Sequence, residues 1–325
     1  MILTEFTLGY ALLSGMSLIG GLGSGALGVS LALKNPEILR SSRLASLVTT
    51  LVFVGLWIRL AMVPLWFWML SSLIPSIPGT MCLWGVHNAN SPISWIATGL
   101  KLLLPFFYGF WIAMHSLDVR YDEQPLLRMK IFLLIPLGVL LAIESLTDFM
   151  FLWPLEPVRV TCCTSAYYKV LEGALGGVYG LSHPWGVWAY ALSATMILAV
   201  SVYSLLKRYL SFSWGLVSLF LFVSFLALAS LIFSLQAELS LRLVLPRHAC
   251  IFCLWKQFPD VSIASLFAFL GIFFFTLFAF LGGLSGRKGV DERIAKGPIE
   301  TYARLSCGFL ALGTLDILAR WLLTL

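Results

Sequence analysis

Residues 262–284 read SIASLFAFLGIFFFTLFAFLGGL, a run of 23 positions without a charged side chain. A helix needs about 20 apolar residues to cross the hydrocarbon core of a bilayer. The whole chain has the same character, because 60% of its 325 residues are hydrophobic and 11% are charged, where a soluble domain carries about 25% charged residues. The composition therefore indicates a polytopic membrane protein and argues against a soluble enzyme or a nucleic-acid-binding protein.

Seven further segments share this apolar character. A segment that spans lipid must satisfy its own backbone hydrogen bonds, and the alternating pattern of a β-barrel is absent, so each segment is expected to be helical. The eight predicted spans are residues 7–33, 45–73, 94–115, 131–154, 185–206, 211–236, 262–284 and 305–325. We expect an all-α bundle of about eight transmembrane helices that forms a single membrane domain, residues 1–325.

The basic residues between the spans predict the orientation of the chain. Thirteen of the 21 Lys and Arg residues lie in the connections after the first, third, fifth and seventh spans, and five lie in the other connections. Short cytoplasmic loops are enriched in Lys and Arg. Both termini are therefore expected on the outer, periplasmic side of a bacterial inner membrane. The net charge of +6 then reflects membrane topology, and we expect a lipid bilayer and no nucleic acid as partner.

Five of the six cysteines fall in the connections expected on the outer side, namely Cys82, Cys162, Cys163, Cys250 and Cys253. Thiols in such a compartment can become and remain oxidised. Cys250 and Cys253 form a C-x-x-C motif, and positively charged neighbours before the motif favour the thiolate form of its first cysteine. Cys250 is therefore predicted to be the attacking thiol and Cys253 the resolving one.

This cysteine arrangement resembles that of the bacterial quinone-linked disulfide-generating membrane proteins and of vitamin K epoxide reductase relatives, which have a four-helix core. The C-x-x-C motif and the cysteines of the other outer loops carry the resemblance. It implies that Cys250 and Cys253 form the pair next to a quinone. It also implies that Cys82 pairs with Cys162 or Cys163 and exchanges with a thioredoxin-like periplasmic partner.

Other interpretations of the outer residues stay open. A metal or haem site is one, and a soft metal could be bound by the ligands Cys250, Cys253, His248 and His87. Structural disulfides that staple the outer loops of a membrane subunit are another. Under the redox hypothesis Trp255 and His248 are candidate cofactor contacts, although Trp255 could also belong to the aromatic belt at the membrane interface.

Six ionisable side chains lie inside the predicted spans, namely Arg59, Lys101, Glu144, Asp148, Asp316 and Arg320. At a rise of about 1.5 Å per residue, all six fall in the outer half of the membrane. An isolated charge at the bilayer centre costs about 2.5–3.5 kcal/mol, so such residues usually face the bundle interior and pair. By depth, Arg59 is expected to neutralise Glu144. The six residues could be ion pairs that fix helix packing, or a polar pocket or proton path in which Glu144 or Asp148 carries protons.

Overall fold

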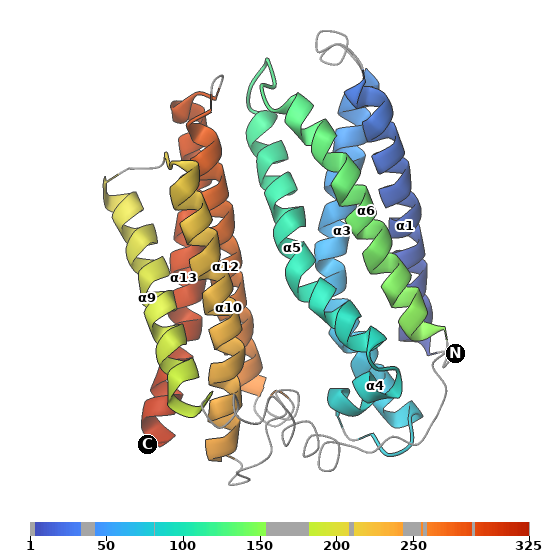
Figure 1. The fold of residues 1–325 in the computed structure, drawn as a ribbon, viewed down its shortest axis with the longest axis vertical. Helices are drawn as coiled ribbons and strands as arrows, with labels where there is room; N and C mark the ends of the chain where they lie inside the picture. The colour runs from blue at the N-terminus through green and yellow to red at the C-terminus, as the bar shows by residue number, and fades with distance from the viewer. Residues whose placement is uncertain are drawn as a thin grey trace. The chain divides into compact units, whose positions relative to one another are not determined.

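The computed structural model describes residues 4–33, 43–80, 82–153, 182–207, 211–242, 255, 259–287 and 290–324. Within these ranges the regular secondary structure is helical, and no strand is present (Figure 1). Eight of the helices are long and apolar enough to cross a membrane. The chain is therefore an integral membrane protein of the all-α class, as its sequence predicts.

Each predicted span corresponds to one long helix. The helices are α1 (Glu5–Ala32), α3 (Arg43–Leu73), α5 (Ile93–Asp118), α6 (Leu127–Leu152), α9 (Ser182–Lys207), α10 (Trp214–Arg242), α12 (Pro259–Ser285) and α13 (Glu292–Thr324). The largest difference is at the start of α13, which begins 13 residues before the predicted boundary. Glu300 explains this extension, because its carboxylate lies 3.8 Å from Lys296 Nζ and 3.2 Å from Arg304 Nη2, each one helical turn away. Such pairs support polar turns that a search for apolar residues leaves out.

The long helices form two compact units, Met1–Val160 and Thr161–Leu325, and each is described by itself. In the first unit α1 packs on α3, α3 on α5, α5 on α6, and α6 on α1, so that consecutive helices close a ring. In the second unit α9, α10, α12 and α13 pack in the same cyclic order. We call these units the first bundle and the second bundle. A single membrane domain stays a prediction.

Glycines bring α1 and α6 of the first bundle into close contact. A Cβ atom added to Gly138 of α6 would lie 2.8 Å from the carbonyl oxygen of Gly21 and 3.2 Å from the Cα of Gly25, both in α1. Small residues permit such close approach between the backbones of membrane helices. Further along the same pair of helices, Tyr10 of α1 reaches Asp148 of α6, so this contact also positions polar side chains.

A short helix covers one end of the first bundle. The chain leaves α3 through a single 3-10 turn, η1 (Ile74–Ser76), and then forms α4 (Leu83–Ala89) before α5 begins. Val86 of α4 is fully buried and belongs to the same hydrophobic core as Tyr10 and Trp66. We call this end of the bundle the α4 end. Seven residues are too few for a periodic pattern that sequence could reveal, so burial of α4 on the core fixes its place.

Candidate functional site

Four ionisable side chains meet inside the first bundle. Arg59 extends from α3, Lys101 from α5, and Glu144 and Asp148 from α6, and each side chain is at most 2% exposed. We call these four residues the charge cluster. Two of them are basic and two are acidic, so the cluster is balanced when all four are ionised. Such pairing is what burial of charge in a membrane interior requires.

Lys101 is the cation nearest to both carboxylates. Its Nζ lies 2.5 Å from Oε1 of Glu144 and 2.9 Å from Oδ2 of Asp148. The Nη1 atom of Arg59 lies 3.9 Å from Glu144 Oε1 and 3.7 Å from Asp148 Oδ2. The expected pairing of Arg59 with Glu144 is therefore confirmed, but Arg59 is the more distant of two cations that the carboxylates share.

Three hydroxyl groups complete the surroundings of the carboxylates. Tyr10 and Ser14 of α1 both donate to Oδ2 of Asp148, over 3.1 and 3.0 Å. Tyr108 of α5 donates to Oε2 of Glu144. All four helices of the first bundle thus contribute, since α3, α5 and α6 supply the charge cluster and α1 supplies hydroxyl groups that donate to it.

A search of the sequence for ionisable groups missed these hydroxyls, because Ser and Tyr are common in membrane helices. Their spacing is the signal that could have found them. Tyr10 and Ser14 are four residues apart and therefore share a helix face. Lys101 and Tyr108 are seven residues apart, which also places them on one face of α5.

Aromatic rings lie between the charge cluster and the apolar core. The Nζ atom of Lys101 is 5.7 Å from the ring centroid of Tyr10 and 5.6 Å from that of Trp66, within the range of cation–π attraction. The indole N–H of Trp66 donates to Oγ1 of Thr98 over 3.1 Å. Since both rings also pack in the core that contains Val86, the charge cluster is continuous with the packing beneath α4.

The two carboxylates differ in how their oxygens are satisfied. Both oxygens of Glu144 accept a hydrogen bond, one from Lys101 and the other from Tyr108. Asp148 accepts through Oδ2, whereas its buried Oδ1 has no hydrogen-bond partner among the described residues. A buried polar atom without a partner is uncommon and calls for an explanation such as a catalytic role, a water or an ion.

Two of the predicted site residues lie at α4. Cys82 directly precedes the helix and is 2% exposed, and His87 in the helix is fully buried. The His87 ring stacks on Trp95, with centroids 4.4 Å apart and planes inclined by 23°. Burial lowers the pKa of His87 to about 4, and the nearby Cys82 acts in the opposite direction. The imidazole is therefore neutral at neutral pH.

The other predicted cysteines and one histidine lie outside the described residues, namely Cys162, Cys163, Cys250, Cys253 and His248. The gathering of the outer cysteines into one patch therefore stays a prediction. Trp255 is half-buried, and its carbonyl accepts a hydrogen bond from Ser262 over 3.1 Å. Asp316 is half-buried in α13 of the second bundle, and the side chain of Arg320 lies outside the described residues.

In the described part of the chain, no group of three or more His, Cys, Asp or Glu side chains could hold a metal ion. Of the four ligands considered for a metal site, only His87 belongs to that part. The metal alternative therefore depends on Cys250, Cys253 and His248 and stays a prediction.

A second buried ion pair joins α5 to α6 at the end of the first bundle away from α4. Nζ of Lys130 lies 2.6 Å from Oδ2 of Asp118 and 3.4 Å from Nδ1 of His115. The backbone N–H of Leu126 donates to Oδ1 of Asp118 over 2.7 Å. Lys130 directly precedes the span predicted from sequence, but it belongs to α6 and is 1% exposed, because Asp118 neutralises it there. These bonds hold together the end of α5, the start of α6 and the short connection between them.

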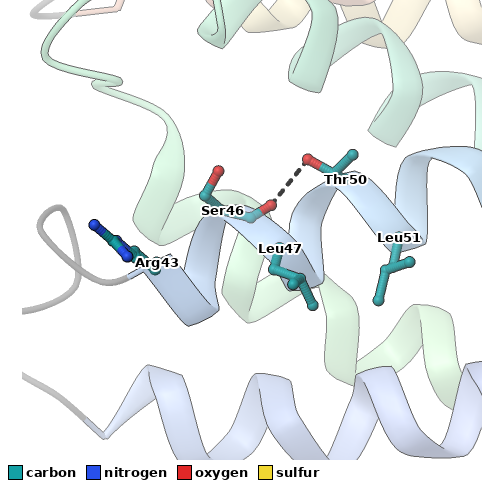
Figure 2. Close-up of a pocket in the computed structure, with 5 residues that line it drawn as sticks. All are labelled: Arg43, Ser46, Leu47, Thr50 and Leu51. Atoms are coloured by element: carbon teal, nitrogen blue, oxygen red, sulfur yellow. Dashed lines mark hydrogen bonds between the residues drawn. The ribbon is translucent and has the colours of Figure 1, made fainter.

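Figure 2 shows a surface hollow on α3 that is lined by Arg43, Ser46, Leu47, Thr50 and Leu51. All five residues come from one helix, and Thr50 donates to the carbonyl of Ser46 over 2.9 Å. A second hollow is lined by Ile93, Phe149, Met150 and Trp153. Neither hollow is lined by a member of the charge cluster. The charge cluster is therefore enclosed among packed side chains, which fits either ion pairs that fix helix packing or a buried proton path.

Comparison with known proteins gives no match to this chain among protein-family models, curated proteins or solved structures.

Proposed function

We propose that this membrane protein carries out thiol–disulfide exchange at the α4 end of the first bundle, with protons supplied by the charge cluster. The observation that supports this proposal is the shared core. Val86 of α4 packs with Tyr10 and Trp66, whose rings line the charge cluster. Cys82 and His87 lie at the same short helix, so a thiol and buried proton carriers are joined by continuous packing.

The proposed reaction balances when a quinone is the electron acceptor. A dithiol of a thioredoxin-like partner reduces a disulfide between Cys82 and Cys162 or Cys163, and the partner leaves as a disulfide. The resulting pair of thiols reduces the disulfide of Cys250 and Cys253 by exchange. The quinone then reoxidises that pair. The two thiols lose two electrons and two protons, and the quinone gains the two electrons and, by relay through the charge cluster, two protons to become the quinol.

The described residues at α4 suit the proton transfer that thiolate formation needs. The thiolate is the nucleophile in disulfide exchange, so the proton of the Cys82 thiol must leave. Negative charge on Cys82 raises the pKa of the buried His87. Because the pKa of His87 is still about 4, the imidazole can pass on the proton that leaves Cys82 but does not retain it.

We place this chemistry on the outer face of a bacterial inner membrane. The bias of Lys and Arg toward the opposite connections supports this orientation. Disulfides form and persist on that side. A membrane-impermeant maleimide added to intact cells is expected to label Cys250 after reduction, and labelling that requires broken cells would reverse the orientation.

Thiol trapping on the full-length protein in its native membrane tests the exchange. Free thiols are alkylated with a mass-tagged maleimide before and after the quinone pool is reduced. The wild-type protein is expected to shift from oxidised to reduced cysteines. Cys250→Ser should abolish reoxidation by the quinone, and Cys82→Ser should abolish reduction by the partner. Cys307→Ser, at a half-buried position in α13, is the matched control and should leave the redox state unchanged.

Two results would reject the exchange. Cysteines that stay fully oxidised whatever the state of the quinone pool would be structural disulfides. Thiols that react with maleimide only after a chelator has been added would instead belong to a metal site.

A further inference from the structure

The hydrogen bonds of the charge cluster distinguish its two carboxylates. Protonation of Glu144 would place a new O–H donor on an oxygen that already faces a donor, either Lys101 or Tyr108. Protonation of Asp148 on Oδ1 would disturb no existing bond, because that atom has no partner among the described residues. Asp148 can therefore gain a proton on Oδ1 without loss of a hydrogen bond that it already makes.

Every helix of the first bundle presents a titratable or polar group to Asp148. Tyr10 and Ser14 of α1 and Lys101 of α5 donate to Oδ2, and Arg59 of α3 lies 3.7 Å from the same oxygen. These contacts use Oδ2 alone. They hold the carboxyl group in place in either protonation state.

The charge of the cluster changes by one between the two states of Asp148. With Asp148 ionised, two cations face two carboxylates and the cluster is neutral. With Asp148 protonated, Lys101 and Arg59 share Glu144 as their counterion and the cluster carries one positive charge. Lys101 Nζ lies 2.5 Å from Glu144 Oε1, so Lys101 has a carboxylate partner whether or not Asp148 is ionised.

We propose that Asp148 is the proton-exchanging residue of the charge cluster and that Glu144 is its permanent counterion. Asp148 is also the carboxylate closer to the α4 end, since Phe151 and Leu152 in the next turn of α6 belong to the core that contains Val86. The use of this proton by thiols rests on the proposed function. The assignment of the proton to Asp148 does not.

Infrared difference spectroscopy of the full-length protein in liposomes tests this assignment directly. A protonated carboxyl group has a C=O stretching band that its carboxylate lacks, so a buried group that exchanges protons gives a band that changes with pH. We expect such a band in the wild-type protein. Carbon-13 labelling of aspartate should shift the band, and labelling of glutamate should leave it in place. This comparison needs no substitution and therefore does not depend on how a variant folds.

Two variants then identify the residue. Asp148→Asn should remove the band, whereas Glu144→Gln should retain a band that appears at lower pH, because Asp148 then faces both cations without a second carboxylate. A band that survives in Asp148→Asn, a band shifted by labelled glutamate, or no titrating carboxyl band would overturn the assignment; the last result would leave Oδ1 as the partner of an ordinary buried water. Loss of thiol exchange in the trapping experiment, with the infrared band intact, would reject the proposed function and leave this inference standing.

Discussion

The two bundles, whose helices are labelled in Figure 1, close the same ring of four consecutive helices, yet their interiors are chemically different. In the first bundle six buried side chains are Asp, Glu, Lys or Arg, namely Arg59, Lys101, Asp118, Lys130, Glu144 and Asp148. In the described part of the second bundle, the buried polar side chains are hydroxyl groups. Most of these bond within their own helix, as Ser224 does to the carbonyl of Phe220. Among the buried side chains that the structure describes, those that join helices by charge belong to the first bundle.

Two helices of the second bundle, α12 and α13, are joined by close backbone contact, as α1 and α6 are in the first bundle. A Cβ atom added to Gly271 of α12 would lie 2.6 Å from the backbone nitrogen of Leu310 in α13. One added to Gly313 of α13 would lie 2.5 Å from the backbone nitrogen of Ala268 in α12. Close backbone contact at glycine thus occurs in both bundles, at Gly138 in the first and at Gly271 and Gly313 in the second. The comparison teaches that the first bundle adds buried charges to this contact, so it should be the more sensitive of the two to loss of a charge.

The largest effect is expected when a cation is removed from the first bundle. Lys101→Met leaves Glu144 and Asp148 with Arg59 as their one remaining cation. Loss of one partner of a buried ion pair costs about 3–5 kcal/mol. The free energy of unfolding, measured by titration with sodium dodecyl sulfate in mixed micelles, should fall by that amount.

Lys296→Met is the matched control for this change. Lys296 pairs with Glu300 but is 40% exposed, and exposed pairs contribute about 0–1 kcal/mol. Equal losses in the two variants would show that the charge cluster is hydrated rather than buried.

The second expected effect separates the two carboxylates of the cluster. Glu144→Gln turns an amide donor toward Lys101 or Tyr108, whereas Asp148→Asn can place its amide at the position of the unpartnered Oδ1. Because each variant loses one negative charge, the difference between them reports the hydrogen bonds. Glu144→Gln should cost about 1–3 kcal/mol more in free energy of unfolding. Equal costs would mean that Oδ1 of Asp148 faces a donor.

These comparisons also show what sequence could predict. The eight spans followed from length and hydropathy, because a bilayer imposes about the same apolar length on every spanning helix. The pairing of Arg59 with Glu144 followed from depth. The start of α13 did not, because Lys296 and Glu300 extend the helix by pairing outside the apolar run.

The polar surroundings of the cluster were harder to predict. Tyr10 and Ser14 lie more than 130 positions from Asp148 in the chain, so only the packing of α1 on α6 shows that they meet. The position of α4 likewise depends on the core it covers. Sequence alone locates the charged residues within spans, which must be buried away from lipid. Tertiary packing decides which neutral groups surround them.

A third effect should appear in the second bundle. Gly313→Ala forces a methyl group against the backbone of α12, and overpacking of this kind costs about 1–3 kcal/mol. Gly308→Ala, on the same helix, places its methyl group where no atom lies within 4 Å. This control should be neutral or stabilising by up to about 1 kcal/mol, because Ala favours helix over Gly. Equal losses, again measured by detergent titration, would show that α12 and α13 are not in backbone contact.

A fourth effect concerns α4 and depends on pH. The pKa of His87 is about 4 in the folded protein and has an ordinary value of 6.5. Between these values the unfolded chain binds a proton at His87 and the folded protein does not. The free energy of unfolding should therefore decrease as pH falls from 6.5 toward 4, by at most about 1.4 kcal/mol per pH unit.

His87→Phe keeps an aromatic ring against Trp95 but removes the titrating group, so the stability of this variant should vary less with pH across that window. Asn88→Gln, a change at the next position of α4, should preserve the wild-type pH dependence and serves as the control. The measurement is thermal unfolding in detergent at a series of pH values. If His87→Phe and the wild-type protein lose stability at the same rate as the pH falls, then His87 is protonated within the folded protein. α4 would then be open to water, and the first bundle would lack the closed end that separates its charges from the surface.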